Sequence, residues 1–101
     1  MDTIQKVPVL SKDEERIVYC FQLLGDKTRY KIFKLLLYRE QLCVSQIAQK
    51  LDISVSAVSQ HFKFFEMIGL VDKERTGQKI CYLLKVNDDL VDKLVSITEE
   101  N

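Results

Sequence analysis

The feature that most constrains this chain is a pair of adjacent helix signals in its middle. Residues 44–51 and 55–67 carry apolar side chains at helical spacing. Asp52 and Ile53 interrupt the periodicity between them, and Ser54 is a good N-cap for the second segment. The stretch therefore predicts a helix, a short turn and a second helix.

The periodicity changes after Gly69, which is expected to end the second helix. Residues 70–75 and 79–84 look like strands, and the intervening Thr76-Gly77-Gln78 is a turn sequence. The pair predicts a β-hairpin. A helix-turn-helix followed by a hairpin is typical of a winged helix-turn-helix, in which the second helix of the pair lies in the major groove of DNA.

Three further helices complete the predicted fold. They are expected at about 12–24, 27–38 and 87–98, with Ser11 and Asp26 as N-caps of the first two. The fold class is thus mainly α with a β-hairpin wing, in the order four helices, two strands and a last helix. Residues 1–10 are expected to form an N-terminal arm, 11–98 a DNA-binding and dimerisation domain, and 99–101 a tail.

Size and composition exclude several classes of protein. The chain has 101 residues, of which 47% are apolar and 30% charged, so one domain with one core is expected. No apolar run approaches the roughly 20 residues that span a membrane, and no secretory signal is evident. Three widely spaced cysteines, an odd number, argue against a disulfide framework. A cytoplasmic protein with no membrane partner is expected.

The formal net charge of zero hides an uneven distribution. Residues 1–26 hold three basic and five acidic side chains, residues 27–85 eleven and five, and residues 86–101 one and five. The middle segment therefore carries +6 between ends of −2 and −4. Phosphate binding needs positive charge, so the central segment is the one expected to face nucleic acid.

The second helix of the pair has an exposed face suited to DNA. Val58, Phe62 and Phe65 cluster on one side, which leaves a short, polar, weakly cationic face without a carboxylate on the other. Gln60 has the amide that pairs with adenine, and Lys63 has the charge that pairs with a phosphate. The expected DNA contacts in this helix and its cap are Ser54, Val55, Ser56, Ala57, Ser59, Gln60, His61 and Lys63.

The hairpin adds three cations around its turn, Lys73, Arg75 and Lys79. A wing in this position is expected to contact backbone phosphates or the minor groove. His61, the single histidine, lies at the edge of the apolar face, so packing or a phosphate contact is favoured over metal binding. There is no histidine–nucleophile pair and no glycine-rich phosphate loop, so the chain is not expected to be an enzyme.

Several linked motifs resemble the ArsR/SmtB repressors. The run LGDKTRYKI from Leu24 to Ile32 resembles the family's "ALGDPTRLRIL", and SVSAVSQHFK from Ser54 to Lys63 resembles its "SQSTVSxHLK" recognition helix. Gly69-Leu70-Val71 resembles "AGLV". The likeness covers roughly residues 15–97. It departs at Lys27, where proline is usual, and at Val55, where glutamine is common.

The resemblance implies a homodimer that represses transcription and releases double-stranded DNA on sensing a signal. The first and last predicted helices carry more apolar positions than a single chain should expose, which independently favours a two-fold interface. The expected interface residues are Ile17, Cys20, Phe21, Leu24, Leu90, Val91, Leu94 and Val95. Such a dimer would set its two reading helices roughly 34 Å apart.

The signal stays open at this point. The family's thiol site resembles "ELCVCDL", but here Ser45 replaces the second cysteine after Cys43, and one thiolate cannot hold a soft metal alone. Cys20 or Cys81 would have to converge on Cys43. The last helix has three aspartates and no histidine, so the family's zinc-type site looks absent. No cofactor is required. A metal ion, a thiol redox signal using Cys43 and no cysteine-based sensor remain as alternatives.

Two functional classes fit these residues. One is a sequence-specific DNA-binding repressor, and the other is a winged-helix protein-interaction module that has lost DNA binding. The second should also have lost the basic face, but Lys63, Lys73, Arg75 and Lys79 are present. DNA binding is therefore the favoured hypothesis.

Overall fold

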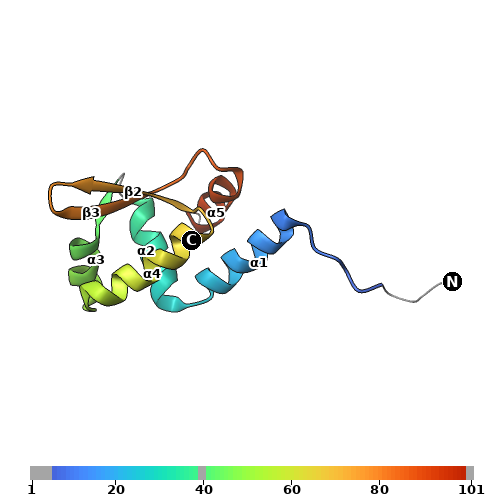
Figure 1. Cartoon of the computed structure of the whole chain (residues 1–101), viewed down its shortest axis with the longest axis horizontal. Helices are drawn as coiled ribbons and strands as arrows, with labels where there is room; N and C mark the ends of the chain where they lie inside the picture. The colour runs from blue at the N-terminus through green and yellow to red at the C-terminus, as the bar shows by residue number, and fades with distance from the viewer. Residues whose placement is uncertain (1–5, 39–40, 100–101) are drawn as a thin grey trace.

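The computed structural model describes residues 6–38 and 41–99 of the chain, which form five helices and a three-stranded antiparallel sheet (Figure 1). The predicted winged helix-turn-helix is confirmed. Residues 1–5 of the expected arm and 100–101 of the expected tail lie outside the described part. The elements are α1 (Lys12–Leu24), α2 (Lys27–Leu37), β1 (Leu42–Cys43), α3 (Val44–Leu51), α4 (Val55–Met67), β2 (Val71–Thr76), β3 (Lys79–Leu84) and α5 (Asp89–Glu99).

Side-chain caps fix the starts of the helices. At α1, the Glu14 backbone N–H donates to Ser11 Oγ at 3.1 Å and the Ser11 N–H donates to Glu14 Oε1 at 3.0 Å. Asp26 and Ser54 each accept a hydrogen bond from the backbone N–H three residues later. These bonds satisfy donors that the first helical turn leaves without partners. The predicted starts of α1, α2 and α4 are therefore confirmed.

The last helix begins two residues later than predicted. Asp88 Oδ1 accepts hydrogen bonds from the backbone N–H groups of Leu90 and Val91, at 3.0 and 3.2 Å. The carboxylate thus caps the first turn, and α5 starts at Asp89 rather than at Asn87. Apolar periodicity alone did not separate the capping residue from the helix.

The sheet contains one strand more than the predicted hairpin. No strand was predicted before the hairpin, but Leu42 and Cys43 pair with Tyr82 and Cys81 of β3, which gives the strand order β1-β3-β2. The correction has a simple cause, because two residues are too few to show strand periodicity. Between β2 and β3 the turn places Gly77 at φ 62°, in the left-handed region that glycine adopts without strain.

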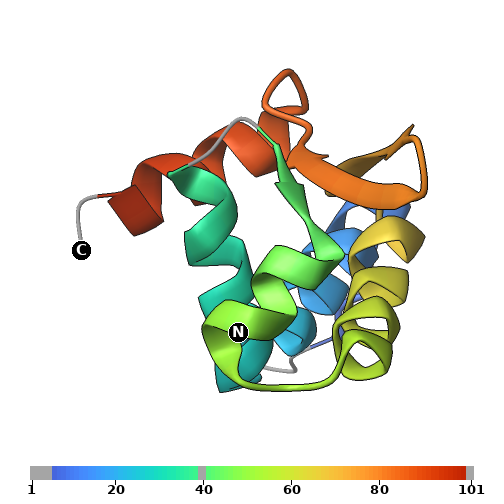
Figure 2. The same cartoon turned by 90° about the vertical axis from the view of Figure 1, so that its left-hand side faces the viewer.

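The core lies between the helices and the sheet. In Figure 2 the sheet lies above α3 and α4. Phe33, Phe62 and Phe65 are fully buried there. The Phe62 ring stacks on Tyr82 of β3, with centroids 3.9 Å apart and planes 4° apart. Burial of large aromatic side chains dominates core energetics, so this stack fixes α4 against the wing.

Arg16 connects α1 to the opposite side of the domain. Its Nε donates to the carbonyl oxygen of Ile68 at 2.9 Å, and its Nη2 lies 3.0 Å from Asp88 Oδ2. One guanidinium therefore joins the first helix to the end of α4 and to the cap of α5. None of the helices in the described part is both long enough and apolar enough to cross a bilayer.

Candidate nucleic-acid interface

Helix α4 presents the polar face that the sequence predicts. Ser54, Val55, Ser56, Gln60 and Lys63 are exposed. Ala57, Ser59 and His61 are half-buried, while the opposite face is buried in the core. The exposed residues lie along one side of the helix, from its N-terminal cap to its third turn, so short polar side chains and one cation are available to a partner.

His61 sits at the border between this face and the core. Its Nδ1 atom is buried and has no hydrogen-bond partner among the described residues. The Asp26 cap lies close enough to respond to the charge on His61. The pKa of Asp26 is lowered mainly by the hydrogen bond from the Arg29 backbone N–H. Burial opposes this change, and the charges of Arg29 and His61 lower the pKa further.

The wing carries its three predicted cations on exposed positions. Lys73 and Arg75 are two residues apart on β2 and so point to the same face of the sheet. Lys79 pairs with Thr76 beside the Gly77 turn. Within the described part of the chain, none of the three forms an ion pair, so their charge is available to an anionic partner.

The wing's carboxylates are engaged elsewhere. Asp72 forms an ion pair with Lys85 across 3.7 Å. Glu74 Oε2 accepts a hydrogen bond from Gln41 Nε2 at 2.7 Å. Each carboxylate therefore has a partner within the domain other than the three cations of the wing.

Tyr82 sets the wing relative to α4. Its hydroxyl donates to Glu66 Oε1 at 3.0 Å, and its ring stacks on Phe62. Burial, this hydrogen bond and the charge of Glu66 raise the pKa of Tyr82 to about 12, so the hydroxyl keeps its proton and acts as a donor at neutral pH. The start of α4 and the wing turn consequently lie at the same end of the molecule, opposite the N-terminal arm (Figure 1).

The residues expected to form the dimer interface differ in how far they are buried within one chain. Cys20, Val91 and Leu94 are buried within the single chain. Ile17, Leu24, Leu90 and Val95 are half-buried, and Phe21 is 66% exposed. Cys20, Val91 and Leu94 therefore offer little surface to a partner, in contrast to their expected role.

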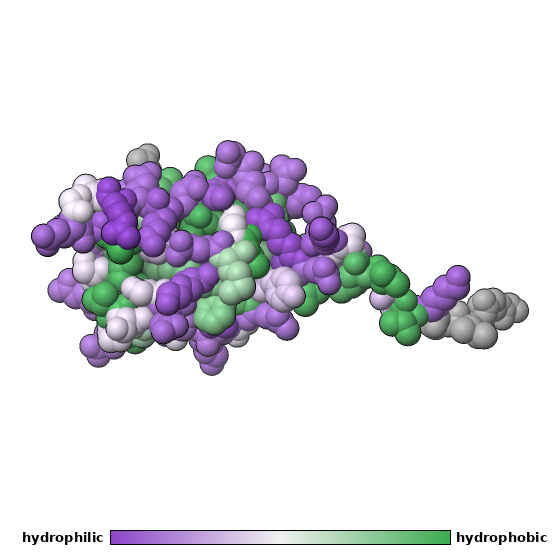
Figure 3. Space-filling view, in the orientation of Figure 1, coloured by the Kyte–Doolittle hydropathy of each residue, from purple (hydrophilic) through white to green (hydrophobic). Residues whose placement is uncertain are grey.

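Other apolar side chains, which were not among the expected interface residues, are exposed on α1 and the arm. Val18 and Tyr19 of α1 are exposed next to Phe21. Figure 3 shows green hydrophobic side chains along the arm, while purple hydrophilic ones cover much of the body; Val7 and Val9 are almost fully exposed. A helical wheel with a wider apolar stripe for α1 would have identified Val18.

A groove of about 1000 Å³ opens between α1 and the C-terminal half of α4. Tyr19, Phe64 and Met67 contribute its apolar walls, and the Arg29 guanidinium lies 5.1 Å from the centroid of the Phe64 ring. Helix α1, which has exposed apolar side chains, lines one side of this groove.

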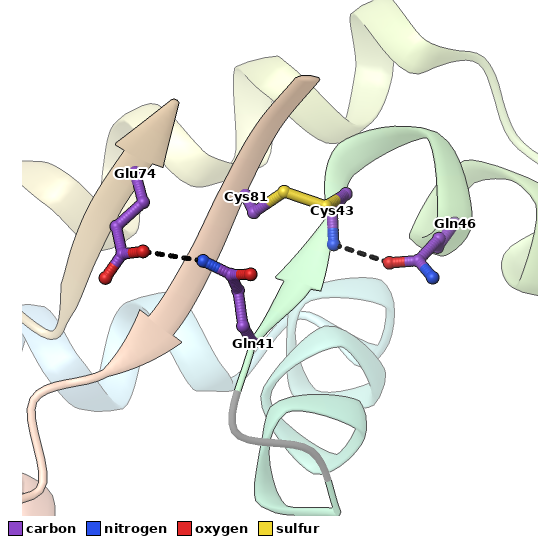
Figure 4. The surroundings of a disulfide bond; sticks show 5 residues. All are labelled: Gln41, Cys43, Gln46, Glu74 and Cys81. Atoms are coloured by element: carbon purple, nitrogen blue, oxygen red, sulfur yellow. Dashed lines mark hydrogen bonds between the residues drawn. A yellow bond between two sulfur atoms is a disulfide. The ribbon is translucent and has the colours of Figure 1, made fainter. Parts of the chain in front are cut away.

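The prediction that the cysteines form no disulfide is wrong. Cys43 and Cys81 form a disulfide, 38 residues apart in sequence (Figure 4). The pairing follows from β1, which places these residues directly opposite each other. Cys20 does not converge on them. It is a free, buried thiol on α1, and burial raises its pKa, which makes it unreactive.

A metal site would require several ligating side chains close together. Across residues 6–38 and 41–99, no three His, Cys, Asp or Glu side chains are grouped so as to hold a metal ion. The three cysteines proposed as metal ligands divide instead into one bonded pair and one buried thiol.

Comparisons with known proteins agree with this geometry. Residues 26–73 match the model of the bacterial regulatory protein arsR family. A cadmium resistance regulatory protein, CadC of Listeria innocua, is 35% identical over 65 residues, which are 64% of this chain. These residues are 55% of CadC, so the chain spans about half the length of that relative.

Two further likenesses cover most of the chain. A Halobacterium salinarum protein assigned as the arsenical resistance operon repressor ArsR is 33% identical over 90 residues, which are 88% of this chain and 67% of that protein. The structure of HlyU from Vibrio cholerae has a TM-score of 0.78 at 24% identity, over 90% of this chain and 96% of that one, and shares the fold. This chain belongs to the ArsR/SmtB family of DNA-binding transcriptional regulators, which are not enzymes.

Proposed function

We propose that the chain is a homodimeric, sequence-specific repressor that reads the major groove with α4 and touches backbone phosphates or the minor groove with the wing. One observation carries the proposal. The start of α4 and the wing turn lie at the same end of the molecule, so both can reach one DNA duplex. Gln60 and Lys63 are exposed on α4, and Lys73, Arg75 and Lys79 form no ion pair in the described part.

The two groups of residues have different expected roles. Gln60 is the side chain suited to reading a base edge, because its amide donates and accepts in the pattern that adenine presents. Lys79 lies at the wing turn, where it suits a phosphate. A base contact should affect one sequence, whereas a phosphate contact should affect all sequences and the salt dependence.

The test is a titration of fluorescent duplexes by the full chain at several salt concentrations. Gln60→Ala should weaken the preferred sequence by about 1–3 kcal/mol and change others little. Lys79→Ala should weaken every sequence and lower the salt slope by about one. Lys93→Ala on α5 is the control. If the wild type binds no duplex at low salt, a protein-interaction module becomes the better reading.

Dimerisation through α1 is part of the same proposal. Val18, Tyr19 and Phe21 are exposed and apolar on one helix, and burying them against a second copy would remove apolar surface from water. Sedimentation should give a dimer for the wild type and a monomer for Phe21→Glu. Val86→Glu is a matched control, since Val86 is about as exposed as Phe21, at 64% against 66%, and lies outside α1. A Phe21→Glu variant that remains a dimer contradicts this interface.

A metal signal is a second candidate for the regulatory input, because CadC is a cadmium resistance regulator and this chain has a cysteine at the start of α3. With Cys81 opposite it, the reduced pair would supply two thiolates. Titration of the reduced chain with Cd(II), followed by sulfur-to-metal charge-transfer absorbance, tests the candidate. Cys43→Ser should abolish the absorbance, and a signal that survives it would assign the metal to other ligands.

A further inference from the structure

The Cys43–Cys81 pair joins two parts of the DNA-binding machinery. Cys43 is the N-cap residue of α3, the first helix of the helix-turn-helix. Cys81 lies in β3, the central strand of the sheet and one side of the wing. The disulfide is thus a covalent link between the helix-turn-helix and the wing (Figure 4).

The two cysteines lie in register in the sheet. Cys43 is the direct partner of Cys81 in the β1–β3 ladder, and Glu74 of β2 is the partner of Cys81 on the other side. The Cys43 backbone N–H donates to Gln46 Oε1 at 2.9 Å, and Gln41 donates to Glu74. These bonds do not involve the sulfur atoms and can persist when the disulfide is opened.

The two cysteines differ in exposure. Cys43 is half-buried, whereas Cys81 is fully buried. A small thiol or disulfide therefore reaches the sulfur of Cys43 first, and Cys81 is placed to resolve the mixed disulfide. A reachable cysteine beside a resolving one is the arrangement that reversible thiol chemistry requires.

We propose that Cys43 and Cys81 form a reversible dithiol–disulfide site that adjusts DNA affinity, which rests on the function proposed above. The oxidant is a low-molecular-weight disulfide. The Cys43 thiolate attacks one of its sulfur atoms and forms a mixed disulfide, releasing one small thiol. The Cys81 thiolate then attacks the Cys43 sulfur, forms the protein disulfide and releases the second small thiol. The protein loses two protons and two electrons, and the oxidant gains them.

The oxidised form is the tighter DNA binder. The disulfide joins two residues that are direct partners in the β1–β3 ladder, so it holds the wing against α3. A binding surface held in its bound arrangement loses less conformational freedom on association. Reduction leaves the two-residue β1 pairing and the Gln41–Glu74 hydrogen bond to hold that side of the wing. The affinity should fall by at least about fivefold on reduction.

The experiment uses the full chain, equilibrated anaerobically with defined ratios of reduced and oxidised glutathione. Alkylation of free thiols and mass spectrometry give the oxidised fraction, and fluorescence anisotropy gives the affinity for a duplex enriched by the chain from a randomised library. The oxidised fraction and the affinity should change together. Re-oxidation of the same sample should restore the affinity, which excludes loss of fold.

Three variants sharpen the result. Cys43→Ser and Cys81→Ser should each bind DNA as the reduced wild type does and should not respond to glutathione. Cys20→Ser removes the buried thiol and should keep the full response. A chain that stays oxidised at the most reducing ratio overturns the proposal, because its disulfide is then purely structural.

The remaining outcomes separate this proposal from the function on which it rests. Equal affinity of the oxidised and reduced forms overturns the redox site and leaves the DNA-binding function standing. Tighter binding by the reduced form overturns the argument that the disulfide pre-arranges the wing. Absence of binding by either form overturns both proposals.

Discussion

Removing the Tyr82 hydroxyl tests how firmly the wing is set against α4. Tyr82→Phe keeps the ring that stacks on Phe62 and deletes the hydrogen bond to Glu66. Hydrogen bonds to charged groups contribute about 1.5–3 kcal/mol, but Glu66 is exposed and regains water when its partner is removed. The free energy of unfolding at neutral pH should therefore fall by about 1 kcal/mol.

The variant should behave differently at high pH. The pKa of Tyr82 is raised from 10 to about 12 in the folded chain, so the stabilisation is complete below pH 10 and is lost as pH rises through 12. This difference in pKa corresponds to about 3 kcal/mol. Tyr82→Phe has no hydroxyl to ionise and escapes this loss. The variant should thus be less stable than the wild type at neutral pH and more stable above pH 12.

The assay is urea unfolding of both proteins across this pH range, with Glu66→Gln and the double variant measured alongside. The difference in tyrosinate absorbance between the wild type and Tyr82→Phe isolates the titration of this one side chain. A stability difference that stays constant from pH 7 to pH 12 would refute the argument. Additive effects of the two single substitutions would show that the hydrogen bond contributes nothing.

Three further predictions concern local structure. Asp88→Asn should lower the free energy of unfolding by about 1 kcal/mol, because it removes the charge that pairs with Arg16. Burial opposes ionisation of Asp88, but the hydrogen bonds from Arg16 and the α5 backbone outweigh it and lower its pKa. The wild-type advantage should therefore be present above about pH 4 and disappear in acid unfolding as pH falls further. Gly77→Ala should lower the free energy of unfolding by about 1 kcal/mol. The cause is the left-handed backbone alone, since a Cβ there meets no atom within 4 Å. Gly77→Asn should lose less stability in thermal unfolding, and equal losses for the two variants would contradict a backbone cause. Ser54→Ala should lose about 1 kcal/mol with its cap to Ala57, and Ser54→Asn should recover most of it in the same urea titration.

The helices and the wing could be predicted from the sequence because their signals are local. Ser11, Asp26 and Ser54 each sit immediately before an apolar stripe of helical period, and each accepts the hydrogen bond that its position predicts. The exposed face of α4 follows from the same periodicity, since burying Phe62 and its neighbours leaves the polar side chains outside.

Strand β1 and the disulfide could not be predicted, and they share one cause. A two-residue strand shows no alternation, so Leu42 and Cys43 look like any connector. Its partner strand lies about 40 residues further along the chain. Without β1 nothing places Cys43 opposite Cys81, and an odd number of cysteines argued for free thiols.

The dimer surface was only partly predictable for a different reason. Periodicity shows that a helix has an apolar stripe, but it does not show whether the stripe faces the chain's own core or a partner. Cys20 and Val91 face the core, whereas Phe21 and Val18 are exposed. The direction in which α1 packs, to which Arg16 contributes through Ile68 and Asp88, decides between them.

The position of β2 at the edge of the sheet gives its charges a second consequence. An edge strand has backbone groups able to pair with another chain, and charged side chains on it oppose such pairing. The other edge is guarded by the shortness of β1. Asp72, Lys73, Glu74 and Arg75 therefore also protect the protein from aggregation. Replacing the two cations by valine should give edge-to-edge association in light scattering, whereas glutamine, which is equally uncharged but a poorer strand former, should give less.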